Sequence, residues 1–237
     1  TKLSVNINKI ATLRNARGGD TPNVVKAAID CQNFGADGIT IHPRPDERHI
    51  TKKDVFDIKS IVTKEFNIEG YPSKDFINMV LEVNPEQVTL VPDAPDAITS
   101  DAGWDTLVHL SFLKSIILEF KAIGIRTSLF VEAEPKHIVG AKETQTDRIE
   151  LYTESYARQY VKLKEKAVKP FVESAILARE LGLGINAGHD LNLQNLKYFA
   201  SSVPFLEEVS IGHALISDAL YLGLEKTIDS YKNCLIK

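Results

Sequence analysis

Side chains that can exchange protons recur in this 237-residue sequence at the ends of short apolar runs or just after them. Four of the six histidines occupy such places, namely His42, His49, His189 and His213. Histidine titrates near neutral pH and can both donate and accept a proton, as acid–base catalysis requires. One histidine after a strand is more often a hydrogen-bonded structural residue, so the catalytic interpretation depends on the four meeting on one rim.

Two carboxylates and one amide join this set. Glu69 ends a short run beside Gly70, a position that suits a general base. Glu150 lies inside a run, where strand alternation can point it inward, with a pKa raised by desolvation, or outward, towards a helix cation. The residues alone leave both orientations of Glu150 open. Asn6 ends the first run.

Groups suited to anions follow the same runs. Residues 12–19 and 42–49 carry two arginines each, and the planar arginine fork matches phosphate oxygens. Residues 187–189 and 211–213 end two late runs with a glycine and a histidine before a predicted helix, as at many phosphate sites. Two phosphate groups, or one bisphosphate, are therefore expected on one rim.

The elements that must position these residues alternate along the chain. The predicted strands are 3–8, 37–42, 67–69, 87–92, 126–133, 148–153, 184–187 and 208–212. The predicted helices are 22–34, 51–65, 73–83, 105–124, 135–144, 155–182, 192–200 and 214–234. Eight such pairs predict an α/β protein, a single (β/α)8 TIM barrel that fills residues 1–237 as one catalytic domain.

Two details refine this prediction. The helical stretch 155–182 is too long for one barrel helix and contains Pro170, which predicts an extra helix before the sixth barrel helix. A doubly wound open sheet is the alternative, but it normally has a glycine-rich loop after its first strand. Residues 6–11 contain no glycine, which favours the barrel.

Composition narrows the function. A net charge of −4 disfavours a nucleic-acid partner, and no apolar run approaches the length of a membrane span. A strand pattern from the first residues leaves no room for a signal peptide, and only Cys31 and Cys234 are present, which excludes a disulfide framework. A cytoplasmic protein is therefore expected.

The strongest motifs resemble one family. They are residues 6–7 with 10–17 (NI and IATLRNAR), 35–42 with Arg44 (GADGITIH and R), 48–51 (RHIT), 186–189 (NAGH) and 211–214 (IGHA). Together they resemble pyridoxine 5′-phosphate synthases over essentially the whole chain. The resemblance implies condensation of 1-deoxy-D-xylulose 5-phosphate with 3-amino-2-oxopropyl phosphate, giving pyridoxine 5′-phosphate, phosphate and water. It also implies a homo-octamer that needs no metal or other cofactor.

The resemblance also implies roles for individual residues. His42 and Glu69 would accept protons, His189 would donate one, and Glu150 would stabilise charge in the transition state, which favours the inward orientation. The residues that would contact the substrates are Asn6, Asn8, Lys9, Arg17, Arg44, His49, Thr99, Asp190, Gly212 and His213.

Three departures from the family pattern concern substrate contacts. Asn8 and Lys9 replace an acidic residue and a histidine, and Asp190 replaces a glycine. A carboxylate at Asp190 would repel a phosphate unless it turns away to cap the next helix. The loop at 93–97 is acidic where relatives often carry basic residues.

Other functions remain as alternatives. A Schiff-base aldolase would need a lysine late in a strand, and Lys9 follows the first strand instead of ending it. A metal-dependent hydrolase would need clustered ligands, for which His42, Asp46 and His49 are the candidates. A catalytically altered protein that only binds phosphates is the third alternative, although the presence of all four expected catalytic residues argues against it.

Overall fold

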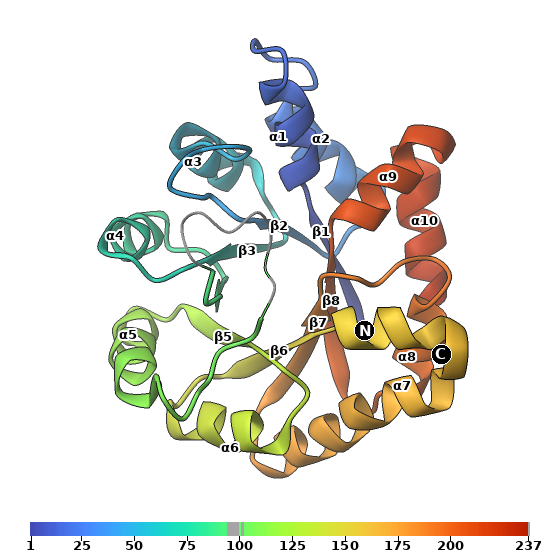
Figure 1. Cartoon of the computed structure of the whole chain (residues 1–237). Coiled ribbons are helices and arrows are strands. Elements are labelled where there is room, and N and C mark those ends of the chain that lie inside the picture. Colours follow the sequence, from blue (N-terminus) through green and yellow to red (C-terminus); the bar gives the residue numbers. More distant parts are fainter. Residues whose placement is uncertain (94–99, 101, 237) are drawn as a thin grey trace.

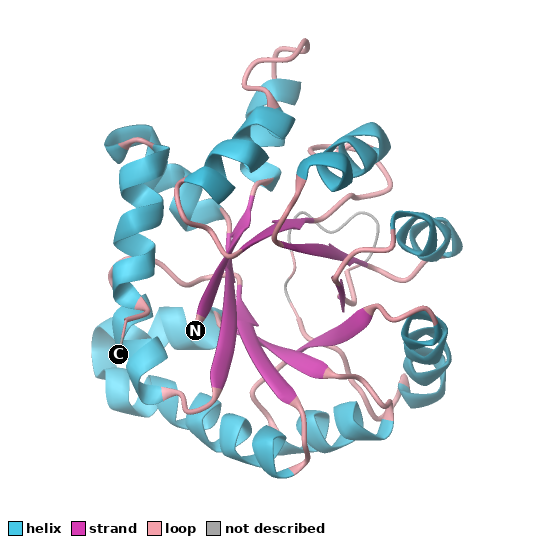
Figure 2. Ribbon diagram, turned by 180° about the vertical axis from the view of Figure 1, so that it is seen from behind, coloured by secondary structure: helices cyan, strands magenta, loops and turns pink. Residues whose placement is uncertain are grey.

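The computed structural model describes residues 1–93, 100 and 102–236 of the chain. The strands are β1 (Lys2–Asn6), β2 (Gly38–Ile41), β3 (Glu65–Gly70), β4 (Gln87–Leu90), β5 (Arg126–Val131), β6 (Arg148–Tyr152), β7 (Gly184–Gly188) and β8 (Leu206–Ile211). They are all parallel and close into a barrel in sequence order, with β8 paired to β1. The predicted (β/α)8 barrel is therefore confirmed, and the helices surround it (Figures 1 and 2).

The helices differ from the prediction at three places. They are α1 (Asn8–Asn15), α2 (Val24–Asn33), α3 (Lys52–Ile61), α4 (Lys74–Val83), α5 (Leu110–Ala122), α6 (Pro135–Glu143), α7 (Glu154–Glu180), α8 (Leu196–Ser202), α9 (His213–Leu222) and α10 (Leu224–Cys234). Residues 8–15 form α1, although Asn8 was expected to end the first strand and the others to lie in a loop; the helix begins where the Asn6 side chain accepts a hydrogen bond from the Asn8 backbone N–H. The expected helix 214–234 is two helices, because Gly223 has a φ of 80°.

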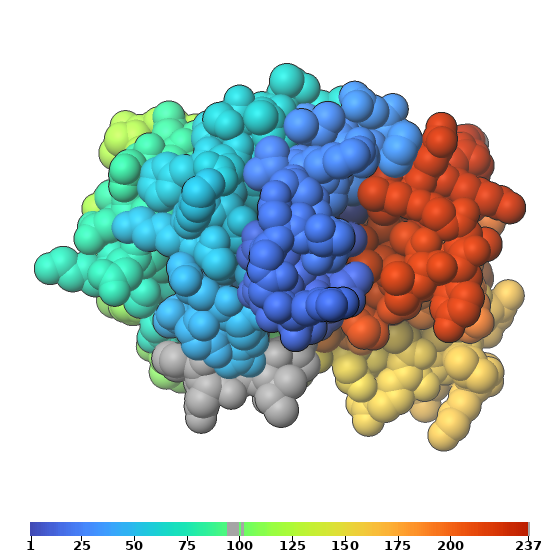
Figure 3. All heavy atoms as spheres, turned by 90° about the horizontal axis from the view of Figure 1, so that it is seen from above, coloured from blue at the N-terminus to red at the C-terminus, as the bar shows by residue number. Residues whose placement is uncertain are grey.

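The extra helical segment before the sixth barrel helix is present, but its break is elsewhere than expected. The α7 backbone leaves the helical conformation at Leu163, seven residues before Pro170, which lies within the helix that follows. The N-terminal helices α1 and α2 lie beside the C-terminal helices α9 and α10, as the blue and red ends of the chain in Figure 3 show. None of the helices in the described part of the chain has the length and apolar character to span a lipid bilayer.

Strand alternation divides the strands into an apolar outer face and a polar inner face. Buried side chains such as Leu3, Ile39 and Phe66 belong to the main apolar core. Their neighbours Ser4 and Thr40 point the other way, and their hydroxyl oxygens lie 2.6 Å apart inside the barrel. Barrel interiors are usually filled by branched apolar side chains, so this polar interior is unusual.

The polar interior continues to the N-terminal end of the strands. Glu208 is buried there and accepts hydrogen bonds from the side-chain amides of Gln87 (3.4 Å) and Asn186 (3.3 Å). Burial and the neighbouring Glu65 raise the pKa of the Glu208 carboxyl to about 8. Arg126 forms an ion pair with Glu65. At the N-terminal ends of the strands, the barrel interior is therefore filled by hydrogen-bonded polar side chains instead of apolar ones.

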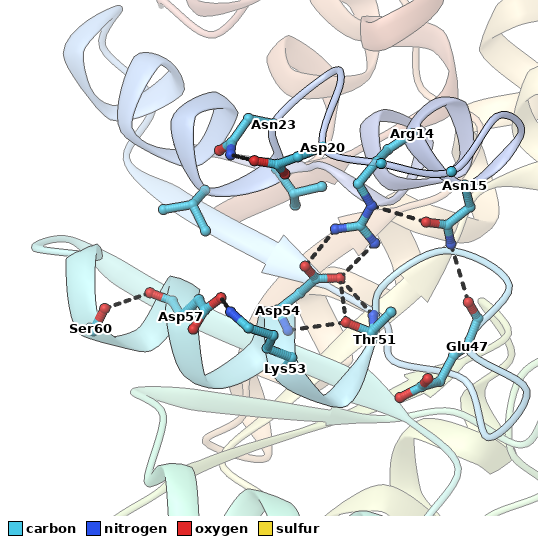
Figure 4. A pocket seen from close by; sticks show the side chains of 14 residues that line it. Arg14, Asn15, Asp20, Asn23, Glu47, Thr51, Lys53, Asp54, Asp57 and Ser60 are labelled. Atoms are coloured by element: carbon cyan, nitrogen blue, oxygen red, sulfur yellow. Dashed lines mark hydrogen bonds and ion pairs between the residues drawn. The ribbon is translucent and has the colours of Figure 1, made fainter.

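A buried ion pair holds α1 against the start of α3 (Figure 4). Two guanidinium nitrogens of Arg14 lie 2.6 and 2.8 Å from the two carboxylate oxygens of Asp54. Asp54 also accepts hydrogen bonds from the Thr51 backbone and hydroxyl, and Arg14 donates to the His49 carbonyl oxygen at 3.2 Å. Arg14, one of the arginines in the predicted anion loop, therefore fixes the loop that carries His49.

This ion pair predicts a stability loss that depends on pH. Burial alone would raise the pKa of the Asp54 carboxyl, but the hydrogen bonds from Arg14 and Thr51 outweigh it and hold the pKa below its ordinary value. Asp54→Asn leaves Arg14 buried without its counter-charge, so we expect a loss of about 3–5 kcal/mol in the free energy of unfolding at neutral pH. Urea unfolding of both proteins measures it.

The sign of the pH effect follows from the lowered pKa. The stabilisation of the folded protein by the ion pair is fully present above the ordinary aspartate pKa of about 3.9. It is lost as pH falls through the lower pKa that Asp54 has in the folded protein. The difference in the free energy of unfolding between the wild type and Asp54→Asn should therefore become smaller only below about pH 4. Asp57→Asn, which breaks the exposed pair with Lys53, is the control and should change stability little. An equal loss in both variants would contradict this account.

Candidate active site

Glu69 lies at the C-terminal end of β3 and connects three strands. Its carboxylate accepts hydrogen bonds from the Ser210 hydroxyl of β8 (3.3 Å) and the Asn6 amide of β1 (3.4 Å). Burial raises the pKa of the Glu69 carboxyl to about 7, against the opposing effects of the Ser210 hydrogen bond and of nearby His189. A carboxyl group with this pKa is divided between its two protonation states near neutral pH, as a general base requires.

Glu150 points into the barrel, which settles the orientation that its sequence position left open. It is 3% exposed, and the Thr89 hydroxyl lies 3.5 Å from its carboxylate. Burial and the charges of Glu69 and Glu208 raise the pKa of its carboxyl well above the ordinary value. Only a glycine at position 188 permits this placement, since a Cβ there would lie 2.2 Å from a Glu150 oxygen.

His42 and His49 lie together where β2 ends and its loop turns towards α3. Their ring centroids are 6.2 Å apart, and the His42 backbone N–H donates to the Asn8 side chain at 2.9 Å. Burial and then the cationic Arg44 lower the pKa of both rings, well below the ordinary value for His42 and to about 4 for His49. Both imidazoles are therefore neutral near pH 7. Lys9 adds to this effect at His49.

Arg44 is bound to a residue that the sequence analysis did not select. Its guanidinium lies 2.5 Å from the buried carboxylate of Asp93, which follows β4. The Ser100 hydroxyl donates to the same carboxylate oxygen at 2.7 Å, and the Ser100 carbonyl accepts from the Tyr152 hydroxyl at 3.3 Å. The only signal in the sequence was a carboxylate directly after a predicted strand, at the start of the acidic loop 93–97.

His189 and Asp190 follow β7 on the same rim. The His189 ring meets the edge of Tyr152, with centroids 5.2 Å apart, and its Nδ1 lies 2.6 Å from an Asp190 carboxylate oxygen. Asp190 was expected either to contact substrate or to turn away. It turns towards the neighbouring histidine.

The remaining predicted site residues have fewer described contacts with the other residues of the rim. Gly212 ends β8 beside Asn6, to which a Cβ at position 212 would approach within 3.1 Å, and the exposed His213 begins α9. Arg17 is exposed in the turn after α1, and in the described parts of the chain no hydrogen bond or ion pair joins it to the rim. Thr99 lies outside the described residues.

Several contacts could not be read from the sequence. Ser210 and Thr89 are ordinary strand residues whose role follows from strand register, because inward-facing side chains of distant strands meet only in a closed barrel. Tyr152 of β6 forms an apolar wall with Phe130 of β5 and with Val91, which directly follows β4. Alternation within β4–β6 was the one available signal for this wall.

The cavity drawn in Figure 4 is distinct from this rim. Its volume is about 890 Å³, and it lies between the α1–α2 loop and α3, lined by Arg14, Asp20 and Asp54 among others. None of the predicted site residues lines it. Among the described residues, no group of three or more His, Cys, Asp or Glu side chains is arranged to hold a metal ion.

The rim therefore combines a carboxyl group titrating near neutrality, a second buried carboxyl group, two neutral imidazoles and one rim histidine. Residues from β1, β2, β3, β6, β7 and β8 meet there. Such a site can remove a proton from one atom of a bound molecule and return one to another.

Solved structures share the fold at low sequence identity. Phosphoribosylanthranilate isomerase from Thermotoga maritima superposes with a TM-score of 0.62 at 13% identity, covering 99% of this chain and 98% of that one. Identity this low supports the barrel fold alone.

Curated relatives are much closer in sequence. The proteins named pyridoxine 5′-phosphate synthase from Bacteroides thetaiotaomicron and Christiangramia forsetii are each 65% identical over 235 residues, which is 99% of this chain and 99% of each relative. The family model described as pyridoxal phosphate biosynthesis protein PdxJ matches residues 3–237. The chain therefore belongs to the PdxJ family of pyridoxal phosphate biosynthesis proteins.

Proposed function

We propose that this protein is a pyridoxine 5′-phosphate synthase, which condenses 1-deoxy-D-xylulose 5-phosphate with 3-amino-2-oxopropyl phosphate. The observation that carries the proposal is the meeting of Glu69 and Glu150 with the histidines of β2 and β7 at one barrel mouth. Membership of the family supports the choice of substrates. Condensation, elimination and ring closure all require repeated proton transfers at carbon and oxygen, which is the chemistry of this rim.

Proton removal is assigned to Glu69 and His42. The raised pKa of Glu69 makes its carboxylate a stronger base than an exposed glutamate, and it remains ionised in about half of the molecules near pH 7. His42 is neutral because burial and Arg44 lower its pKa, so its ring can accept a proton. Asn6 and Asn8 orient these two groups through hydrogen bonds.

Proton donation is assigned to His189, and charge stabilisation to Glu150. The raised pKa of Glu150 favours the protonated form of its carboxyl group, which can donate a hydrogen bond to an oxygen that gains negative charge. Thr89 and the close backbone of Gly188 hold that group at the centre of the barrel.

The two phosphate groups would bind at opposite sides of the mouth. Arg44, His49 and Lys9 lie on the β1–β2 side, where Asp93 holds the Arg44 guanidinium in place. Gly212 and His213 lie at the N-terminus of α9, where backbone N–H groups and the helix dipole favour an anion. Arg17 and Thr99 are proposed as further contacts to deoxyxylulose phosphate by family resemblance.

The same resemblance supports three further proposals. The barrel is the single catalytic domain, it assembles as a homo-octamer, and it works in the cytoplasm. The reaction is proposed to need no metal or other cofactor, because the side chains of the rim supply both acid and base. Size measurement on purified protein would test the assembly.

The activity test is direct. Purified protein incubated with both phosphorylated substrates should release inorganic phosphate and form pyridoxine 5′-phosphate, detected by absorbance and mass. His42→Ala and Glu69→Gln should each abolish product formation, because each removes a reacting group, and should leave the thermal midpoint nearly unchanged, because neither side chain belongs to the apolar core. No product from well-folded wild-type protein would refute the synthase and leave the phosphate-binding alternative.

A second prediction concerns the pH dependence set by Glu69. Because its carboxylate is the reactive form, kcat/KM should rise with pH through about 7. The Ser210 hydrogen bond stabilises that carboxylate, so Ser210→Ala should raise the Glu69 pKa and move the rising limb to higher pH.

Ser128→Ala is the matched control for this shift. Ser128 is also a buried barrel-strand serine, and its hydroxyl makes no hydrogen bond within the described structure. Its pH profile should follow that of the wild type. If the rising limb of the kcat/KM profile of Ser210→Ala stays in place or moves to lower pH, Glu69 is not the base.

A further inference from the structure

We infer that Asp190 is a positioning residue for catalysis, which fixes the tautomer and orientation of the His189 ring. The inference rests on the proposed function, in which His189 donates a proton, and it adds a residue that acts through His189 instead of through the substrate. Its basis is the 2.6 Å distance between His189 Nδ1 and an Asp190 carboxylate oxygen.

The backbone explains how two consecutive side chains can meet. In an extended strand, neighbouring side chains point to opposite faces of the sheet. β7 ends at Gly188, and His189 then takes a φ of 91°, a left-handed conformation that is uncommon for histidine. This turn ends the alternation and brings the Asp190 carboxylate to the side of the ring that carries Nδ1.

The Asp190 backbone is held on both sides. Its N–H donates to the Thr153 hydroxyl oxygen at 3.1 Å, and its carbonyl accepts from the Asn195 side-chain amide at 3.2 Å. The Thr153 hydroxyl donates in turn to the Gly188 carbonyl at 2.8 Å, and both Thr153 and Asn195 are buried. The carboxylate therefore projects from a fixed point, although its own side chain is partly exposed.

A carboxylate at Nδ1 determines what the other ring nitrogen can do. An ionised carboxylate only accepts hydrogen bonds, so the proton of the neutral ring resides on Nδ1. Nε2, at the opposite side of the ring, is then the nitrogen that gains and releases protons. When Nε2 gives its proton to a substrate oxygen, Nδ1 keeps its own, and Asp190 remains a carboxylate throughout.

Stability is a poor explanation for the pairing. The His189 and Asp190 side chains are 27% and 34% exposed, and ion pairs this open to solvent contribute little to folding. The pairing also answers the expectation that Asp190 would repel a phosphate, since the carboxylate is engaged by the ring. Tyr152 packs edge-on against the same ring and limits its rotation.

The test combines kinetics with a direct view of the ring. Asp190→Ala removes the acceptor, and Asp190→Asn keeps the shape but removes the charge. We expect kcat to fall about 10- to 100-fold in both variants while KM changes little, as for other residues that orient a functional histidine. Asp190→Glu should recover part of the loss. Nitrogen-15 NMR of histidine-labelled protein, assigned with His189→Gln, should show Nδ1 protonated in the wild type and a changed pattern in Asp190→Ala.

Controls separate this inference from the proposed function. Asp229→Ala removes an exposed carboxylate of α10 and should alter neither kcat nor the His189 signals. If the wild type forms product while Asp190→Ala and Asp190→Asn keep both its kcat and its His189 signals, the inference is wrong and the proposed function stands. If the wild type forms no product, the proposed function fails, and the catalytic role of Asp190 fails with it, whatever the NMR signals show.

Discussion

The candidate site depends on two carboxyl groups that share a buried space. Glu69 and Glu150 project from β3 and β6 into a barrel interior from which water is largely excluded, and the charge of Glu69 disfavours ionisation of Glu150. Desolvation is the largest cause of both raised pKa values, so burial inside the barrel is what shifts the titration of these two carboxyl groups. At Glu69 the hydrogen bond from the Ser210 hydroxyl and the nearby His189 partly oppose this rise in pKa.

Two arginine side chains are each held by a buried aspartate, and this pairing determines the role that each arginine can take. Asp93 holds Arg44, and Asp54 holds Arg14. The first pair leaves an oriented guanidinium at the mouth, whereas the second fixes the backbone around His49. Two arginines that look alike in the sequence therefore have different roles, one at the site and one in the scaffold.

The barrel could be predicted from the sequence, and so could the common rim on which the residues proposed for its chemistry lie. Strand and helix periods are local properties, and strand ends of a parallel barrel must face one rim, which made the placement of His42, Glu69 and His189 predictable. Helix α1 was missed because its first turn has no side-chain cap on Ile7 and its polar residues are typical of a loop. Ser210, Thr89 and Asp93 were missed because their roles arise from register between strands that are distant in the sequence.

The kink in α7 is another feature whose position could not be predicted from the sequence. Proline was the expected breaker, yet Pro170 continues the helix and the backbone departs at Leu163, an exposed residue with no special preference for a break. Nothing in the structure explains why the kink is at that residue.

The pairing of β1 with β8 has a consequence for how the protein is made. A nascent chain that has left the ribosome up to His189 already contains Glu69, Glu150 and three of the four histidines predicted at the rim, but it lacks Ser210 and the strand that closes the barrel. Without β8 the barrel cannot close, so these carboxyl groups would lie on the face of an open sheet and lose part of the burial that raises their pKa values. The basicity of Glu69 therefore depends on the last strand of the chain to be made.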